Sequence, residues 1–134
     1  MTFAARLSAL AALGSIAVAA PAAAQNYGYI EDVAFFERVA VGNVEITPFG
    51  IKRDTRCADL RFCTRENRFT VSVILHDYRG MTEVVLDLDR PAVVPGGYLV
   101  LRDAGTRPKF RGVIPLREYA LAIEYIPFDE AVIR

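Results

Sequence analysis

The sequence predicts an all-β domain: a single antiparallel β-sandwich, of immunoglobulin-like or Greek-key type, with six to seven short strands and one disulfide. Apolar and polar residues alternate with a period of two in several segments, as in strands that bury one face. Turn-forming glycines and prolines separate these segments at intervals of about ten residues. A small barrel is the alternative architecture.

Period-two alternation predicts short strands at 38–47, 49–52, 68–76, 82–89, 98–102 and 117–125. The alternation changes phase at Gly42-Asn43, which indicates a bulge or a tight turn there. Turn residues at 77–80 connect their two neighbouring segments as an antiparallel hairpin. Residues 104–115 contain glycines and prolines and are expected to form a loop. A helix over 116–125 is the alternative for the last segment, but strict alternation with two tyrosines favours a strand.

The N-terminal segment, residues 1–24, predicts a cleaved secretory signal peptide. An apolar stretch at 7–20 follows one arginine, and Ala22 and Ala24 form the A-x-A pattern that precedes a cleavage site. This stretch is too short for a transmembrane anchor, because its fourteen residues rise ~1.5 Å each and span about 21 Å of a ~30 Å hydrocarbon core. We therefore expect a periplasmic or secreted bacterial protein with no transmembrane anchor in the mature chain.

The rest of the chain is expected to divide into an N-terminal arm at 25–37, a β-sandwich domain at 38–126 and a C-terminal tail at 127–134. Within the arm, 27–36 has apolar residues at helical spacing, so an arm or a short helix is expected there. One of the 16 basic residues lies in the signal segment, which leaves 15 against 16 acidic residues and a net charge of −1. This balance is typical of an ordinary soluble domain and excludes a general polycation for nucleic acid.

Cys57 and Cys63 are the only cysteines, and an even number in an exported chain predicts one disulfide. Closing this short loop is expected to contribute about 2–2.5 kcal/mol to stability. A redox pair would use C-x-x-C, and a zinc site would need two more nitrogen or sulfur ligands from a chain whose single histidine is His76. We expect a structural disulfide, with no metal and no cofactor.

The ten residues from Asp54 to Cys63 read D-T-R-C-A-D-L-R-F-C. They resemble the pattern D-[ST]-R-C-x5-C of a group of small exported bacterial proteins and lipoproteins without an established function. The resemblance covers about seventy residues, of which only the cysteine loop is specific. It implies a β-sandwich closed by a disulfide near the start of a strand, and it implies no activity. Asn67 stands where the group has glycine, and asparagine also tolerates left-handed backbone angles.

The three residues before the first cysteine, Asp54, Thr55 and Arg56, are expected to organise the loop. An aspartate or threonine side chain can accept backbone N–H groups at a turn, and Arg56 can pair with Asp54 or Asp59. The alternative hypothesis is that the loop presents its arginines and Phe62 to a partner.

Candidate catalytic groups are few. His76 lies at the end of a predicted strand beside Asp77, and we expect it to be an exposed histidine. Glu83, Asp87 and Asp89 are expected to form a solvated acidic face. A deep polar pocket around His76 and Asp77 would instead indicate an enzyme. We assign no catalytic residue.

The basic residues are unevenly distributed. Segment 52–68 contains six basic and three acidic residues, and segment 102–117 contains five basic and one acidic. If both loops reach one end of the sandwich, they form a patch suited to anionic groups or protein carboxylates. The candidate patch residues are Arg61, Arg107, Lys109 and Arg111.

The function expected from these observations is a non-enzymatic binding or interaction module of the cell envelope, with its loops as the contact surface. Its expected partner is an envelope protein or an anionic ligand. A small periplasmic enzyme with a carboxylate or His76-centred site is one alternative. An envelope structural subunit, which would need an exposed apolar edge or patch, is the other.

Overall fold

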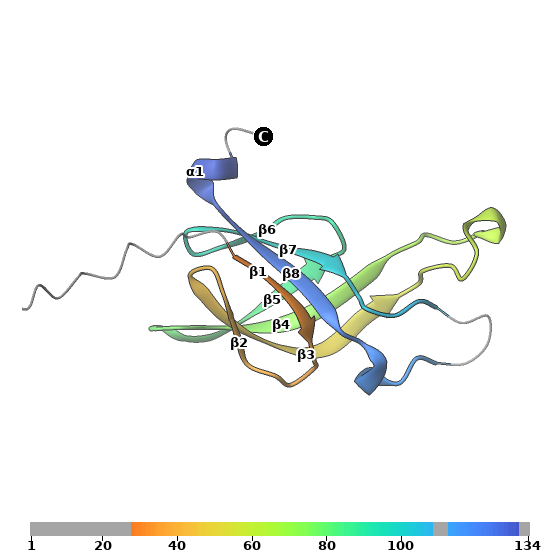
Figure 1. Ribbon diagram of the computed structural model, residues 1–134, viewed down its shortest axis with the longest axis horizontal. Coiled ribbons are helices and arrows are strands. Elements are labelled where there is room, and N and C mark those ends of the chain that lie inside the picture. Colours follow the sequence, from red (N-terminus) through yellow and green to blue (C-terminus); the bar gives the residue numbers. More distant parts are fainter. Residues whose placement is uncertain (1–27, 109–112, 132–134) are drawn as a thin grey trace, which may run out of the picture.

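The computed structural model describes residues 28–108 and 113–131, and the predicted signal segment lies outside these ranges. Two four-stranded antiparallel sheets pack face to face (Figure 1), which confirms the β-sandwich. The described strands are β1 (Gly28–Val33), β2 (Val39–Val41), β3 (Val44–Asp54), β4 (Phe69–Asp77), β5 (Gly80–Asp87), β6 (Ala92–Val94), β7 (Gly97–Asp103) and β8 (Leu121–Pro127). Three short helices are η1 (Leu60–Phe62), η2 (Leu116–Glu118) and α1 (Phe128–Ala131).

The strand order is β1-β8-β7-β6 in one sheet and β2-β3-β4-β5 in the other. Every hydrogen-bonded pair except β1–β8 joins strands that are consecutive in the chain. The sheets are therefore meanders rather than the predicted Greek key. This arrangement brings the loop between β3 and β4 and the loop between β7 and β8 to the same end of the sandwich (Figure 1).

Two of the expected hairpins are present. Val41 pairs with Val44, so Gly42-Asn43 is a two-residue turn rather than a bulge, and Gly42 has a φ of 56°. Asp77 pairs with Gly80 in the β4–β5 hairpin. The segment predicted at 38–47 is divided by the Gly42-Asn43 turn into β2 and the start of β3, and the strand predicted at 49–52 continues β3, because the chain runs past Pro48 through an irregularity in its register with β4.

The structure differs from the sequence predictions in three elements. Residues 28–33 form strand β1 rather than an arm or a short helix, because they pair with β8 at the far end of the chain. Strand β6 was not predicted, since it has only three residues and lies between Pro91 and Pro95. The strand expected at 117–125 begins at Leu121, after the helical turn η2.

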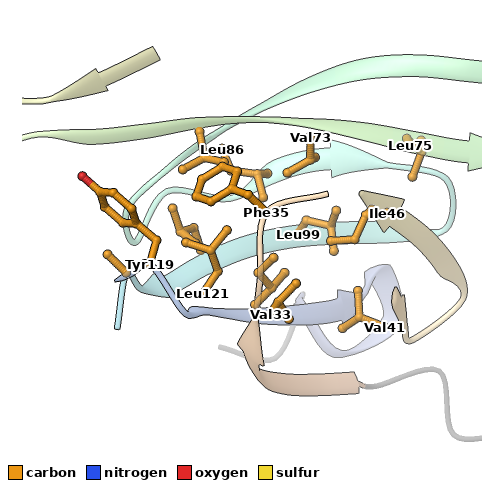
Figure 2. Close-up of a cluster of buried hydrophobic side chains, with 14 of the residues drawn as sticks. Val33, Phe35, Val41, Ile46, Val73, Leu75, Leu86, Leu99, Tyr119 and Leu121 are labelled. Atoms are coloured by element: carbon orange, nitrogen blue, oxygen red, sulfur yellow. The ribbon is translucent and has the colours of Figure 1, made fainter. Parts of the chain in front are cut away.

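The core lies between the inward faces of the two sheets (Figure 2). Alternation places every second residue of β4 inward, and Phe69, Val71 and Val73 are fully buried. Val33 of β1 and Phe35 after it are also buried, which shows that the N-terminal strand belongs to this core. Within the described residues, no helix is long and apolar enough to span a membrane.

Candidate functional site

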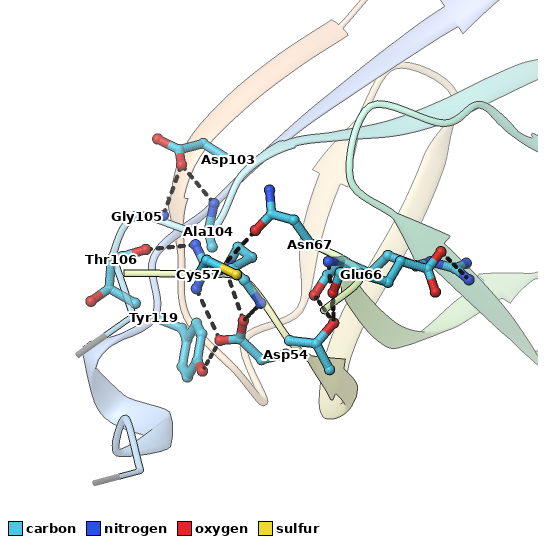
Figure 3. Close-up of polar contacts among 12 residues, drawn as sticks. Asp54, Cys57, Glu66, Asn67, Asp103, Ala104, Gly105, Thr106 and Tyr119 are labelled. Carbon is cyan, nitrogen blue, oxygen red and sulfur yellow. Dashed lines mark hydrogen bonds and ion pairs between the residues drawn. The ribbon is translucent and has the colours of Figure 1, made fainter. Parts of the chain in front are cut away.

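The disulfide between Cys57 and Cys63 closes the loop that connects β3 to β4, as the sequence predicts. Two side chains hold the base of this loop (Figure 3). The hydroxyl of Thr55 donates to the Glu66 carbonyl at 2.6 Å and accepts the Arg68 N–H at 3.2 Å. The amide oxygen of Asn67 accepts the Cys57 N–H at 2.9 Å. The disulfide loop, residues 55–67, is therefore fixed where it leaves the sheet.

Asn67 holds the loop by a different mechanism from the one that the sequence suggests. Asp32, Phe36 and Asp89 are the described non-glycine residues with positive φ, and Asn67 is not among them. A glycine could adopt the same backbone but could not accept the Cys57 N–H. Asn67 thus contributes through its side chain rather than through a left-handed backbone.

Beside the loop, Asp54 and Arg56 form a part-buried ion pair. Arg56 donates from Nε and Nη2 to the two carboxylate oxygens of Asp54, each at 2.9 Å. The side chains are only 14% and 11% exposed. Tyr119 donates its hydroxyl to Asp54 Oδ2 at 2.7 Å, and Arg56 Nη1 donates to the Thr106 carbonyl at 2.7 Å. This cluster connects strand β3 of one sheet to the loop after β7 of the other.

The ion pair lies on aromatic rings. The guanidinium of Arg56 is 4.7 Å from the centroid of the Phe69 ring, and Phe69 stacks on Tyr119 with 5.6 Å between centroids. Phe35 meets Tyr119 edge to face at 5.9 Å. These contacts combine charge pairing with apolar packing at the junction of the two sheets.

The opposing loop is positioned at its start by Asp103 and Gly105. Asp103 Oδ1 accepts the N–H groups of Ala104 at 2.8 Å and Gly105 at 3.3 Å. Gly105 has a φ of +72°, and a Cβ there would lie 2.2 Å from the Ala120 carbonyl oxygen, so a side chain does not fit. This turn places the Thr106 carbonyl against Arg56.

The pKa values of the cluster follow from these contacts. Burial raises the pKa of the Asp54 carboxyl most strongly, but hydrogen bonds from Arg56 and Tyr119 and the charge of Arg56 together lower it below 3.8. Burial, the hydrogen bond to Asp54 and the negative charge of Asp54 raise the pKa of Tyr119 from 10.0 to about 12. At neutral pH the cluster therefore contains a carboxylate, a guanidinium and a neutral phenol.

We expect Tyr119 to make stability depend on alkaline pH. Because the folded protein holds the Tyr119 proton more tightly than the unfolded chain, its contribution is complete below pH 10.0 and is lost as the pH rises toward about 12. Urea unfolding of the wild type and of Tyr119→Phe across this interval measures the effect. The free energy of unfolding should decline less steeply in the variant, and identical slopes would contradict the assignment.

The tip of the disulfide loop contains a second Asp-x-Arg pair. Arg61 Nη2 donates to Asp59 at 2.8 Å, and Asp59 also accepts the Arg61 N–H at the start of η1. Unlike the part-buried Asp54–Arg56 pair, this one lies at the surface. Its neighbours Leu60 and Phe62 are 71% and 74% exposed, although both are large apolar residues. The tip therefore presents two apolar side chains and an arginine to solvent.

The described parts of the two basic loops lie next to each other. Arg107 is exposed and follows Thr106, whose carbonyl binds Arg56. A cavity of about 220 Å³ separates the loops; it is lined by Asp54, Arg56, Arg65, Pro108, Val113, Ile114 and Tyr119. The other two candidate patch residues, Lys109 and Arg111, lie outside the described residues.

His76 lies at the opposite end of the sandwich and is half-buried rather than exposed as predicted, because its ring contacts Thr47 of the neighbouring strand. Its Nε2 is 2.8 Å from the hydroxyl of Thr47, and no hydrogen bond of Nδ1 occurs among the described residues. A cavity of about 520 Å³ adjoins it, lined by Asn43, Val44, His76, Asp77, Tyr78, Arg79 and Pro95. This lining holds no serine or cysteine, and Thr47 does not belong to it. The described lining of this cavity thus contains no serine, cysteine or threonine side chain that could serve with His76 as a nucleophile.

The three acidic residues Glu83, Asp87 and Asp89 have separate partners rather than a shared solvated face. Glu83 pairs with Lys52 at 3.0 Å, and Asp87 pairs with Arg68. Asp89 lies beyond β5 and contacts Arg102 of the other sheet at 3.2 Å. Each of these carboxylates thus has its own basic partner. Among the described residues there is also no group of three or more His, Cys, Asp or Glu side chains arranged to hold a metal ion.

No protein-family model, curated protein or solved structure matches this chain. The resemblance of the cysteine loop to small exported proteins accordingly stays a prediction. What the protein does must be inferred from the geometry of its surfaces.

Sequence reasoning missed Phe69, Thr106 and Tyr119 as members of the Asp54–Arg56 cluster. Tyr119 lies 65 residues from Asp54, and Thr106 lies 50 residues from Arg56. No local spacing connects positions so far apart. The one signal in the sequence was that Tyr119 and Phe69 both fall on the inward face of a predicted strand.

Proposed function

We propose that the protein is an exported, non-enzymatic binding module that contacts an acidic segment of an envelope protein through the tip of its disulfide loop. The observation that carries this proposal is an ordered loop that exposes large apolar side chains. Leu60 and Phe62 are more than two-thirds exposed, while the base of their loop is fixed by the disulfide, Thr55 and Asn67. Exposed apolar residues on a constrained loop are typical of contact surfaces.

A constrained loop favours binding because it loses little further conformational entropy when a partner binds. The cost of ordering the loop is met during folding, when the Asp54–Arg56 pair and the disulfide form. Phe62 also packs under the Arg61 guanidinium, 5.7 Å from its ring centroid. Aromatic residues and arginine are the residue types most enriched at the centres of protein interfaces.

The charge around the tip indicates the chemistry of the partner. The segments 52–68 and 102–117, whose described parts both reach this end, have net charges of +3 and +4 in the sequence. Three of their basic residues are paired with acidic residues outside the segments, namely Lys52, Arg68 and Arg102. A protein surface with carboxylates complements this field, and an apolar residue among them complements Leu60 and Phe62. The predicted signal segment supports an envelope location for this partner, and the disulfide is compatible with an oxidising compartment.

The proposal is tested by photo-crosslinking in the native periplasm. A photo-reactive amino acid replaces Phe62 in one variant and Val93 in a control, since Val93 of β6 is 70% exposed and belongs to the other sheet. We expect a discrete crosslinked protein, identified by mass spectrometry, from position 62 and not from position 93. Equal crosslinking from both positions, or none from position 62, would contradict a contact surface at the tip.

With the captured partner purified, Phe62→Ser is expected to weaken its binding roughly 30-fold or more, the effect of removing about 2 kcal/mol at a binding hot spot. Arg107, Lys109 and Arg111 changed together to Ser should also weaken binding, and more strongly at low salt than at high salt. Val93→Ser is the matched control. Unchanged affinity in Phe62→Ser would refute the proposal.

A further inference from the structure

The described strands leave four sheet edges, at β1, β6, β2 and β5. Strands β2 and β6 have only three residues, and β1 is irregular, with a register shift after Ile30 and a positive φ at Asp32. Short length and irregularity both hinder a strand from pairing with another chain. Strand β5 has neither protection, because its eight residues pair with β4 without a register shift.

The outward side chains of β5 are apolar on either side of one charge. Met81 is 73% exposed and Val85 is 43% exposed, with Glu83 between them. Glu83 is already paired with Lys52 of β3. The strand also contains neither proline nor lysine, the residues that natural edge strands use against association. The first half of β5 is therefore an open edge with an apolar face.

We propose that this edge pairs with the same edge of a second copy of the chain, in an antiparallel dimer whose two-fold axis passes through Thr82. In such a pair, residues 80–84 of the two copies lie opposite one another, with Thr82 facing Thr82. Directly opposite residues share a face, so Met81 faces Glu83 of the second copy. Met81 then lies diagonal to Met81 and Val85 of the second copy, which covers these apolar side chains.

The neighbouring registers of this antiparallel pair are less favourable than the one centred on Thr82. An axis at Glu83 would set two carboxylates directly opposite each other. An axis at Met81 would leave only residues 80–82 of the strand to pair. An axis at Val84 would need the end of β5, but Leu88 bridges to Leu101 and Asp89 donates its N–H to the Leu101 carbonyl, so the other sheet covers that end.

Charge complementarity also supports the Thr82 axis. Arg79, in the β4–β5 turn, then lies diagonal to Glu83 of the second copy, within reach of a long side chain.

The β4–β5 turn and the disulfide loop lie at opposite ends of the sandwich (Figure 1). The dimer would carry its two disulfide loops far from the axis, pointing apart. The inference does not depend on the proposed function of these loops, but it would make the protein bivalent.

Introducing a charge of either sign at Met81 tests the dimer. Sedimentation velocity and equilibrium on the purified protein, up to millimolar concentration, should show a reversible dimer. Met81→Glu should weaken it roughly tenfold because two pairs of like charges then face each other, and Met81→Lys should strengthen it because the introduced ammonium group would face Glu83. Both variants leave the monomer intact, because Met81 is largely exposed. Val93→Glu and Val93→Lys on β6 are matched controls and should leave the dissociation constant of the dimer unchanged.

Thr82→Cys supplies the geometric test. On the axis, the two introduced thiols of a dimer lie within disulfide range, and the native cysteines are already paired with each other. Mild oxidation should yield a covalent dimer from Thr82→Cys and none from Val93→Cys. A wild type that stays monomeric at millimolar concentration would overturn the proposal. So would a dimer that responds equally to both charges at position 81, or one that Thr82→Cys does not crosslink.

Discussion

Arg56→Ala is expected to lower the free energy of unfolding by about 2–3 kcal/mol, less than the ~3–5 kcal/mol for breaking a fully buried ion pair, because Arg56 and Asp54 are part-buried. Arg56 donates three hydrogen bonds, two to Asp54 and one to the Thr106 carbonyl. Its removal leaves the Asp54 carboxylate with Tyr119 as its remaining side-chain donor. It also removes the bond to the Thr106 carbonyl, one of the connections to the opposing loop at this end, so we expect the disulfide loop to lose order as well.

Arg61→Ala is the matched control, because Asp59 and Arg61 have the same Asp-x-Arg spacing and a similar paired geometry at an exposed position. Its stability should stay close to that of the wild type. Urea unfolding at neutral pH measures both variants. In the wild type, the stability that Asp54 contributes should be lost as the pH falls below 3.8, through its lowered folded pKa, whereas Arg56→Ala should lose less. Equal stability of the two arginine variants would refute the structural role of Arg56.

Phe69→Ala is the second large effect: we expect a loss of about 3–5 kcal/mol, as for other fully buried aromatic residues. Phe69 is the first residue of β4 and has no exposed surface. Its ring stacks on Tyr119 on one side and lies under the guanidinium of Arg56. The variant would thus remove core packing and the apolar support of the ion pair together.

Phe49→Ala provides the comparison for this variant. Phe49 lies on β3, the neighbour of β4, but its side chain is partly exposed at the irregularity between Pro48 and Gly50. Urea unfolding should show a much smaller loss for Phe49→Ala than for Phe69→Ala. A double-mutant cycle of Phe69→Ala with Arg56→Ala should also show coupling, since the side chains touch. Strict additivity would argue that the contact contributes nothing.

The two Asp-x-Arg pairs show how much of the site could be predicted from the sequence. The residue types and the loop-closing cysteines are local features, and they lead to Asp54, Thr55 and Arg56 as loop-organising residues. Local reasoning could not decide whether Arg56 pairs with Asp54 or Asp59, because both lie within reach along the chain. The decision depends on burial against Phe69 and Tyr119, which the other parts of the chain supply.

The same division holds for the fold. Alternation along one segment reveals a strand with a buried face, so β4, β5, β7 and most of β8 could be predicted from residues that are close in sequence. Strand β1 could not, because its conformation comes from hydrogen bonds to β8 rather than from its own residue pattern. By itself, the sequence determined the all-β class, the hairpins and the disulfide, which depend on neighbouring residues. Only the tertiary structure decided the meander order, the contacts of the Asp54–Arg56 pair with Tyr119 and Thr106, and the open edge of β5. Each of these depends on which distant segments come into contact, and local patterns do not encode that.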